Sequence, residues 1–272
     1  MRKYIPEIES GGLSLIGSVR EDNQDSIYLP DGLYPPDMGL LYAVADGMGG
    51  YTHGAVASSL ALESLVDTLY EKDAPNPKAL LTGVEKANLE VYKAAQRLAA
   101  GRMGTTLTAA YVVGDNLHLA HVGDSRAYLI RNGRSTCLTS DHTTVGDMVR
   151  AKLIPPDKIR THAQRSVLTK AIGLGLFIQP DIYQHQLMEG DRVVLCTDGV
   201  WSVINDDEFA RVANESSLEQ SSQNLLDLAL NRNTDDNVSA VIFHIQKLVS
   251  VQEEVETEQK ISWFQKLRKL AR

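Results

Sequence analysis

Short hydrophobic runs separated by polar turns recur along the chain and indicate β-strands. They predict strands at residues 13–19, 40–45, 105–113, 116–122, 126–132, 191–197 and 238–245. Several of these runs follow one another across short turns, such as Gly114-Asp115. Tight turns between strands are typical of antiparallel hairpins rather than of βαβ units. The pattern therefore favours antiparallel sheets.

Helical periodicity occurs in other segments. One helix is predicted from about residue 54 to residue 70, and two more near 206–214 and 218–230. Another begins at Asn76-Pro77, since Asn can cap a helix and Pro suits its first position. Its apolar residues recur at helical spacing: Leu80, Val84, Ala87, Val91, Ala95 and Leu98. Helices beside antiparallel strands indicate an α+β fold, with packed sheets flanked by helices.

Two segments depart from this pattern. Residues 142–168 are polar and carry Pro155-Pro156 within an otherwise regular series of strands. A long insertion of this kind in a compact domain is often a lid or a binding loop. Near the C-terminus, residues 253–258 are acidic, whereas 260–272 are basic and amphipathic. We therefore expect one folded domain over 1–247, followed by a tail over 248–272 made of an acidic linker and a basic helix.

Composition narrows the class of protein. A chain of 272 residues that is 43% hydrophobic suits one sizeable domain. The net charge of -8, with no basic run before the C-terminus, argues against nucleic-acid binding. The two cysteines form no disulfide framework or zinc motif, and Cys196 lies in an apolar run. With no signal-peptide pattern and no apolar run long enough to cross a bilayer, a cytoplasmic protein is expected.

Aspartates stand at the ends of several predicted strands. Asp46, Asp124 and Asp198 each directly follow an apolar strand or its last turn. Asp235-Asp236 precede the strand at 238, and Asp25 opens a short strand-like run. In an antiparallel sheet the start of one strand lies beside the end of its neighbour, so these carboxylates can gather at one edge. Taken singly, each is more typical of an ordinary turn than of a metal site.

A cluster of carboxylates requires compensating cations. Two carboxylates about 4 Å apart repel by roughly 4 kcal/mol at an effective dielectric constant near 20. Oxygen ligands of this kind suit Mg²⁺ or Mn²⁺. The glycines after Asp46 would let bound water and substrate approach the backbone, and the Gly47 carbonyl can itself be a ligand. Arg20 can bind phosphate oxygens, although a surface salt bridge with Glu21 or Asp22 is the alternative.

Eight motifs in order resemble the type 2C metal-dependent protein phosphatases, the PPM family, in the form common in bacteria. They are RxxNQD (20–25), DGMGG (46–50), MGTTLTAA (103–110), HVGDSRAYLIRNG (121–133), LTSDHT (138–143), LTKAIG (168–173), LCTDGVW (195–201) and TDDNVSAV (234–241). The resemblance covers roughly residues 10–246. It implies a four-layer α-β-β-α sandwich of two antiparallel sheets flanked by helices. It also implies that the insertion at about 142–168 is the flap of this family.

The same resemblance implies roles for individual residues. Asp46, Asp198 and Asp236 would hold a first Mn²⁺ or Mg²⁺, and Asp236 is preferred to Asp235 because it directly precedes Asn237. A second ion would be held by Asp46 and the Gly47 carbonyl, with Asp25 acting directly or through water. A third, weaker site would use Asp124 with Asp198. Arg20 would bind the substrate phosphate, so that Arg20, Asp46 and Asp198 carry the catalytic roles.

The implied activity is hydrolysis of phosphoserine and phosphothreonine in proteins by a metal-bridging hydroxide. Phosphorylated proteins would then be the substrates, and a Ser/Thr protein kinase a partner. One alternative retains the metal centre but acts on a small phosphorylated metabolite. Another is a non-catalytic module that binds phosphoproteins, which loss of a ligand aspartate would support. None of the expected aspartates is missing.

The chain also departs from the family pattern. Position 48 is Met where many animal members carry a histidine, so a metal-bound water is the general acid expected here. Gln24 replaces a frequent glutamate, and His53 near Tyr51 is expected to be structural rather than a ligand.

The flap and the tail are the segments expected to select partners. In the flap, the residues that could select substrates are Arg150, Arg160, His162 and Arg165, with solvated surface charge as the alternative. The apolar face of the tail comprises Ile261, Trp263, Phe264, Leu267 and Leu270. This face can dock on a membrane, on a partner or on its own domain.

Overall fold

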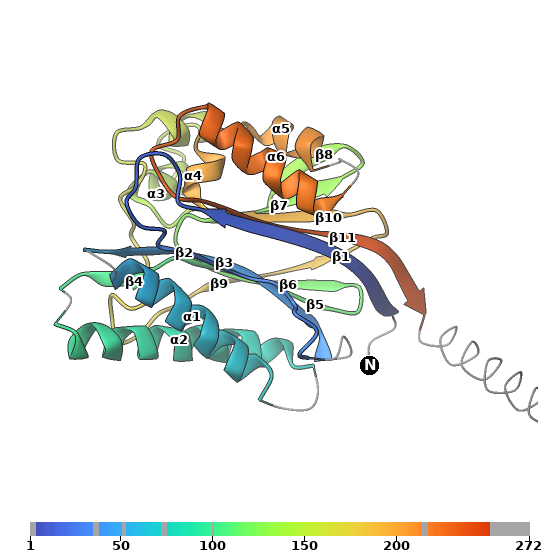
Figure 1. Cartoon of the computed structure of the whole chain (residues 1–272), viewed down its shortest axis with the longest axis horizontal. Coiled ribbons are helices and arrows are strands. Elements are labelled where there is room, and N and C mark those ends of the chain that lie inside the picture. The colour runs from blue at the N-terminus through green and yellow to red at the C-terminus, as the bar shows by residue number, and fades with distance from the viewer. Residues whose placement is uncertain are drawn as a thin grey trace, which may run out of the picture.

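Two antiparallel sheets are stacked between two layers of helices (Figure 1). This computed structural model describes residues 4–34, 38–50, 53–71, 75–99, 101–213 and 217–250. The four-layer α+β sandwich predicted from the sequence is confirmed.

The first sheet has the strand order β1-β11-β10-β7-β8. Its strands are β1 (Tyr4–Leu15), β7 (Arg126–Arg131), β8 (Arg134–Cys137), β10 (Arg192–Cys196) and β11 (Val238–Ser250). Its outer face is covered by α4 (Asp198–Trp201), α5 (Asp206–Val212) and α6 (Leu218–Asn231), as Figure 1 shows. Trp201, Tyr128 and Phe209 are the largest buried side chains in this helix–sheet layer.

The second sheet has the order β2-β3-β5-β6-β9. Its strands are β2 (Asp25–Tyr28), β3 (Leu40–Gly49), β5 (Leu107–Val113), β6 (Asn116–Val122) and β9 (Asp181–Gln186), and β4 (Met103–Thr105) pairs with the end of β3. Helices α1 (His53–Leu69) and α2 (Pro77–Arg97) cover its outer face. As predicted, Asn76 caps α2, because its side chain accepts a hydrogen bond from the Lys78 N–H.

Central strand β3 is buried on both faces, which explains its continuous apolar run. Leu41 and Ala43 pack toward the helices, whereas Tyr42 and Val44 pack between the sheets. The Tyr42 ring stacks on Phe243 of β11 with 4.2 Å between ring centroids. This stacked pair is one of the contacts that hold the two sheets face to face.

The structure differs from the predicted elements mainly at sheet edges. Residues 4–12 of β1, all of β8 and all of β9 were not expected, because edge strands alternate polar and apolar residues and form no apolar run. The predicted strand at 105–113 is divided at Thr106 into β4 and β5. Strand β11 continues to Ser250, so residues 248–250, which were assigned to the tail, pair with β1. The rest of the tail, 251–272, lies outside the described residues.

The flap leaves the sandwich at the predicted boundaries. Its base is closed by a bridge between Thr143 and Leu168, and the Thr169 N–H donates to the His142 carbonyl. The flap contains α3 (Thr144–Arg150) and the short 3-10 helix η2 (Pro156–Thr161). In the part of the chain that the structure describes, no helix is both long enough and apolar enough to span a membrane.

Candidate active site

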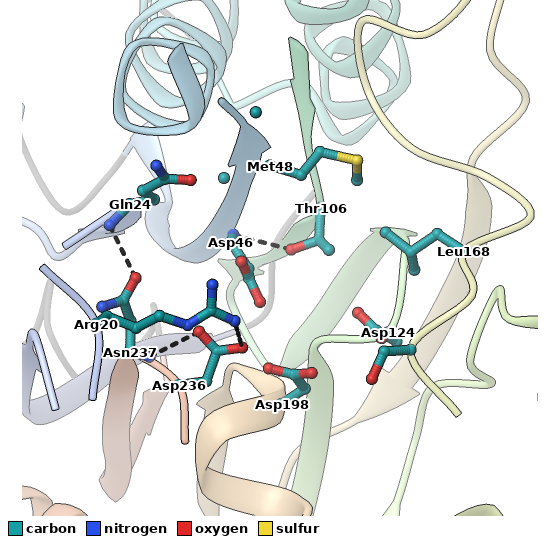
Figure 2. A pocket seen from close by; sticks show the side chains of 13 residues that line it. Arg20, Gln24, Asp46, Met48, Thr106, Asp124, Leu168, Asp198, Asp236 and Asn237 are labelled. Atoms are coloured by element: carbon teal, nitrogen blue, oxygen red, sulfur yellow. Dashed lines mark hydrogen bonds and ion pairs between the residues drawn. The ribbon is translucent and has the colours of Figure 1, made fainter. Parts of the chain in front are cut away.

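Four of the predicted aspartates line one cavity of about 260 Å³ at the end of the sandwich (Figure 2). Asp46 lies in the last part of β3, and Asp124 lies in the turn between β6 and β7. Asp198 is the first residue of α4, directly after β10, and Asp236 lies just before β11. The antiparallel arrangement therefore brings strand ends from both sheets to the same cavity.

Asp46 is held by the break between β4 and β5. Its N–H donates to Thr106 Oγ1 at 2.9 Å, and its carbonyl accepts from the Thr106 N–H at 2.8 Å. The Thr105 hydroxyl also donates to the Asp46 carbonyl, at 2.9 Å. The backbone of Asp46 is thus fixed on both sides. Thr106 also lines the cavity and was not among the site residues predicted from the sequence.

Asp25 lies next to this cavity rather than on its lining. It faces Asp46 in the β2–β3 register and is only 8% exposed. Its Oδ2 atom accepts hydrogen bonds from the hydroxyls of Thr197 at 2.9 Å and Ser239 at 2.6 Å. Burial raises the pKa of Asp25 to about 7, although these two hydrogen bonds oppose the shift. Thr197 and Ser239 were not singled out from the sequence.

The carboxylates of the cavity carry an electrostatic penalty. Burial, followed by the charges of Asp25 and Asp198, raises the pKa of Asp46 well above its usual value. Burial and the charge of Asp198 do the same for the pKa of Asp124. Burial and Asp236 raise the pKa of Asp198 to about 6. A cation among these groups would remove the penalty of their ionised forms.

The donor set fits hard divalent cations. Asp198 Oδ1 is buried without a hydrogen-bond partner, as a free ligand oxygen would be. Three further carboxylates line the same cavity, and carboxylates are the ligands that Mg²⁺ and Mn²⁺ prefer. Among the described residues, no three Asp, Glu, His or Cys side chains already close around one point. Ion binding therefore requires the carboxylates to draw inward or water to complete the coordination.

Arg20 stands at the mouth of the cavity. Its Nη2 lies 2.6 Å from Asp236 Oδ2, and its Nε donates to the Asp235 carbonyl at 3.1 Å. About half of the side chain (53%) remains exposed. The alternative considered for Arg20, a surface salt bridge with Glu21 or Asp22, is not among the ion pairs of the described residues. A guanidinium that borders carboxylates and faces solvent can reach the oxygens of an incoming phosphate.

Asn237 ties the Arg20 loop to the start of β11. Its amide nitrogen donates to the carbonyls of Ile16 at 2.8 Å and Asp22 at 3.0 Å. Its amide oxygen accepts from the Gln24 N–H at 2.9 Å. One buried side chain therefore sets the position of Asp236 relative to Arg20. Asn237 was predicted only to mark Asp236, rather than Asp235, as the ligand, and its own contacts were not expected.

Comparison with known proteins agrees with this geometry. The family model described as "Protein phosphatase 2C" matches residues 17–147 and 174–238. The chain belongs to the protein phosphatase 2C family. The gap between the two matched segments covers most of the flap of this phosphatase 2C chain.

Curated relatives and solved structures extend the match over most of the domain. The chain is 33% identical to the serine/threonine protein phosphatase PstP of Mycobacterium tuberculosis over 83% of its length, but this spans only 43% of PstP. It is 31% identical to PhpP of Streptococcus pneumoniae, covering 89% of this chain and 97% of PhpP. The structure of Stp1 from Staphylococcus aureus matches with a TM-score of 0.83 and 29% identity, covering 91% of this chain and 98% of Stp1.

One solved relative contains metal ions. The catalytic domain of PstP in complex with two manganese ions matches with a TM-score of 0.77 and 30% identity. The match covers 89% of this chain and 99% of that domain. A relative with the same fold has thus been solved with manganese bound.

The glycine after Asp46 has a structural reason beyond ligand access. A Cβ on Gly47 would lie 2.1 Å from the Gly54 carbonyl oxygen and 2.6 Å from the Gln24 carbonyl oxygen. Protein backbone therefore fills the space on the Cβ side of Gly47, while Gly47 and Gly49 themselves line the cavity. Met48 lines the cavity and offers no proton for a leaving alkoxide. His53 begins α1 outside the cavity lining, whereas Tyr51 lies outside the described residues.

Two of the four flap residues expected to select substrates instead fasten the flap to the domain. Arg150 bonds the Asp141 carbonyl at 2.7 Å and its helix neighbour Asp147. Arg160 bonds the Trp201 and Ile204 carbonyls and Asp206. The side chains of His162 and Arg165 do not line the cavity, so the flap residues on its wall are Ser166 and Leu168.

Proposed function

We infer that this protein is a metal-dependent phosphatase that removes phosphate from serine and threonine side chains of proteins. The observation that carries this inference is the cavity lined by Asp46, Asp124, Asp198 and Asp236 with Arg20 at its mouth. Relatives named as serine/threonine protein phosphatases, at about one-third identity, support a phosphoprotein rather than a small metabolite as substrate. Retention of all the expected aspartates supports an enzyme rather than a binding module.

We propose the metal ligands that the family resemblance implies, and the cavity lining and the manganese-bound relative support them. Asp46, Asp198 and Asp236 would hold one Mn²⁺ or Mg²⁺, and Asp46 with the Gly47 carbonyl a second. Asp25 would support the second ion through water, because it lies beside Asp46 but not on the lining. Asp124 with Asp198 would form a third, weaker site.

Residues of the chain would orient the phosphate and hold the metal ligands in position. Bound ions of this kind supply an activated water near neutral pH and neutralise charge on the phosphate. Arg20 would orient the phosphate oxygens for in-line attack and stabilise the charge that develops on them. The backbone bonds from Thr106 and the bonds of Asn237 hold Asp46 and Asp236 in place throughout.

The biological setting is part of the proposal. We propose that the reaction takes place in the cytoplasm, where a Ser/Thr protein kinase would produce the phosphorylated substrates. We also propose that the folded phosphatase domain is followed by a docking tail. The basic, amphipathic composition of residues 260–272 supports contact with an acidic membrane surface or a partner.

The decisive experiment combines metal removal with two substrates. Metal-stripped protein should not hydrolyse a phosphothreonine peptide, and Mn²⁺ or Mg²⁺ should restore turnover. The same preparation should act on the peptide far better than on a panel of small phosphorylated metabolites. Full activity without metal would contradict the metal-centred mechanism. A preference for one metabolite over the peptide would instead support the alternative, in which the substrate is a small phosphorylated metabolite.

A further inference from the structure

A groove between β2 and α1 is separate from the cavity of the aspartates. It encloses about 610 Å³, and none of its lining residues also lines the cavity. Strand β2 is at the edge of its sheet, so no further described strand covers this side (Figure 1). The apolar and aromatic side chains that line the groove are Ile27, Tyr28, Leu33, Tyr34, Leu62 and Val66. Leu33 is 71% exposed, so part of this apolar surface is open to a segment that can cover it.

Acidic residues border this groove. Asp31, Glu63 and Asp67 are among its lining residues, whereas no lysine or arginine is. All three are exposed, and none forms an ion pair within the part of the chain that the structure describes. Glu63 accepts a hydrogen bond from the Ser59 hydroxyl at 2.9 Å, and Asp31 accepts one from the Leu33 N–H at 2.8 Å, but neither donor is charged. An apolar surface bordered by such carboxylates favours an occupant that is apolar on one face and basic around it.

The C-terminal segment 260–272 has this composition. Its apolar residues Trp263, Leu267 and Leu270 recur at the spacing of one helix face. The same segment carries the basic residues Lys260, Lys266, Arg268, Lys269 and Arg272. An amphipathic helix that lays its apolar face into a hydrophobic groove is a recurring mode of recognition. The acidic border would attract this segment, whereas it would repel the head groups of an acidic membrane.

The segment is attached close enough to reach the groove. Ser250, the last described residue, pairs with Tyr4 at the start of β1. Farther along β1, a Cβ on Gly12 would lie 2.9 Å from the side chain of Leu29, the residue directly after β2. Tyr4 and Gly12 are about 26 Å apart along the strand, at ~3.3 Å per residue. Residues 251–259 can extend over about 30 Å, so they can return the basic segment to the level of the groove.

We propose that residues 260–272 dock in the groove between β2 and α1 of their own chain. Their apolar face would cover the groove, and their basic side chains would lie against Asp31, Glu63 and Asp67. Because the segment is tethered, its effective concentration at the groove is far higher than that of a free peptide. An acidic membrane would have to displace the segment, since both use the same apolar face. The docking goes beyond the proposed function and does not depend on it, because the groove and the cavity share no lining residue.

Trp263 reports the docked state in the intact chain. The only other tryptophan, Trp201, is 2% exposed and contributes a constant, shielded signal. In buffer without vesicles, acrylamide should quench Trp263 weakly in the wild type, and Trp263→Phe gives the signal of Trp201 alone. Glu63→Lys combined with Asp67→Lys should lower the docking equilibrium about tenfold, since it turns two attractions into repulsions. Quenching of Trp263 should then increase, and its emission should move to longer wavelength.

Leu33→Ser tests the apolar contact without changing the core, because Leu33 is largely exposed. It should also increase the quenching of Trp263. Leu153→Ser is the matched control, since Leu153 is 73% exposed on the flap, outside the groove. The control for the charge reversal is Glu85→Lys combined with Asp227→Lys, because both residues are exposed on other helices, α2 and α6. Both controls should leave Trp263 shielded.

The outcomes decide between this docking and its alternatives. Strong quenching of Trp263 in the wild type, equal to that in the groove variants, would overturn the proposal. Shielding that survives both groove variants would also overturn it, because the segment would then be covered elsewhere. Shielding that is lost on dilution would assign the segment to a second copy of the chain instead. Hydrolysis of an aryl phosphate should be the same in every variant, so a failure of the docking is distinguishable from a failure of the proposed function.

Discussion

At the scale of single residues, Asp25 is a buried carboxylate whose environment favours the protonated form. Its pKa is raised to about 7, so in the metal-free protein the folded state holds a proton that the unfolded state releases near pH 4. Stability therefore falls as pH rises from about 4 to about 7, because the unfolded state binds fewer protons in that window. Above about pH 7 the folded state bears the full free-energy cost of ionising Asp25.

Asp25→Asn should remove this cost while keeping an oxygen that accepts from Thr197 and Ser239. In the presence of a chelator, the variant should be more stable than the wild type at pH 8 by ~1–3 kcal/mol, and by a clearly smaller margin at pH 5, where only part of the cost is present. Urea unfolding at both pH values measures the difference. Asp227→Asn, exposed on α6, is the control. A difference that does not change with pH would contradict the raised pKa.

Arg20 permits a separation of phosphate binding from metal binding. Arg20→Ala should lower kcat/KM by a factor that corresponds to a loss of roughly 2–4 kcal/mol of transition-state stabilisation, because it removes the group proposed to stabilise the transferring phosphate. Mn²⁺ affinity should be retained or increased, since Asp236 loses its competing cation. Steady-state kinetics tests the loss of kcat/KM, and Mn²⁺ titration tests the retained metal affinity. Arg134 is exposed, and Arg134→Ala is the control. Unchanged kinetics would remove Arg20 from the site.

At the scale of elements, the loop between β1 and β2 supports the loop that carries Asp236. Gly17 has a φ of +81°, and a Cβ there would lie 2.4 Å from the Asp236 carbonyl oxygen. Gly32 has nearly the same φ, +83°, but has nothing within 4 Å of a Cβ. The two glycines therefore share the backbone strain of a substitution and differ only in the steric clash.

Gly32→Ala should cost about 1–2 kcal/mol of stability through its left-handed backbone and leave activity intact. Gly17→Ala should cost more and should also lower Mn²⁺ affinity and kcat/KM, because the clash displaces Asp236. Urea unfolding and Mn²⁺ titration of both variants provide the comparison. If Gly17→Ala lost no more than Gly32→Ala in either measurement, the loop would not support the metal centre.

At the scale of the whole molecule, the cavity and the proposed docking tail belong to separate parts of the sequence. The residues that line the cavity fall between Arg20 and Asn237, and β11 ends the described chain at Ser250. Truncation after Ser250 should therefore leave hydrolysis of a small aryl phosphate unchanged. It should reduce co-sedimentation with anionic lipid vesicles, since each basic residue near such a surface contributes roughly 1 kcal/mol.

Trp263→Ala should reduce the same co-sedimentation by removing an apolar side chain of the tail, and neutral vesicles are the control. Equal and negligible sedimentation of intact, substituted and truncated protein would exclude the membrane. Docking on a protein partner or on the domain itself would then remain.

Much of the candidate site could be predicted because its signal is local. Apolar runs that end in Asp46, Asp124 and Asp198 define strands and their ends within a few residues. Antiparallel pairing then brings alternate ends to one edge, whatever the details of packing. Edge strands β8 and β9 escaped prediction because their polar, alternating residues lack an apolar run.

The sequence by itself determined the strand ends, the order of the motifs and the residue types at the cavity. Only the tertiary structure decided how each carboxylate is held. Asp25 accepts hydroxyl bonds from residues 172 and 214 positions away, which placed it beside the cavity rather than on its wall. Arg160 turned from an expected substrate contact into an anchor for Trp201, because η2 packs against α4. Such contacts depend on how distant elements pack together, and local periodicity carries no information about that packing.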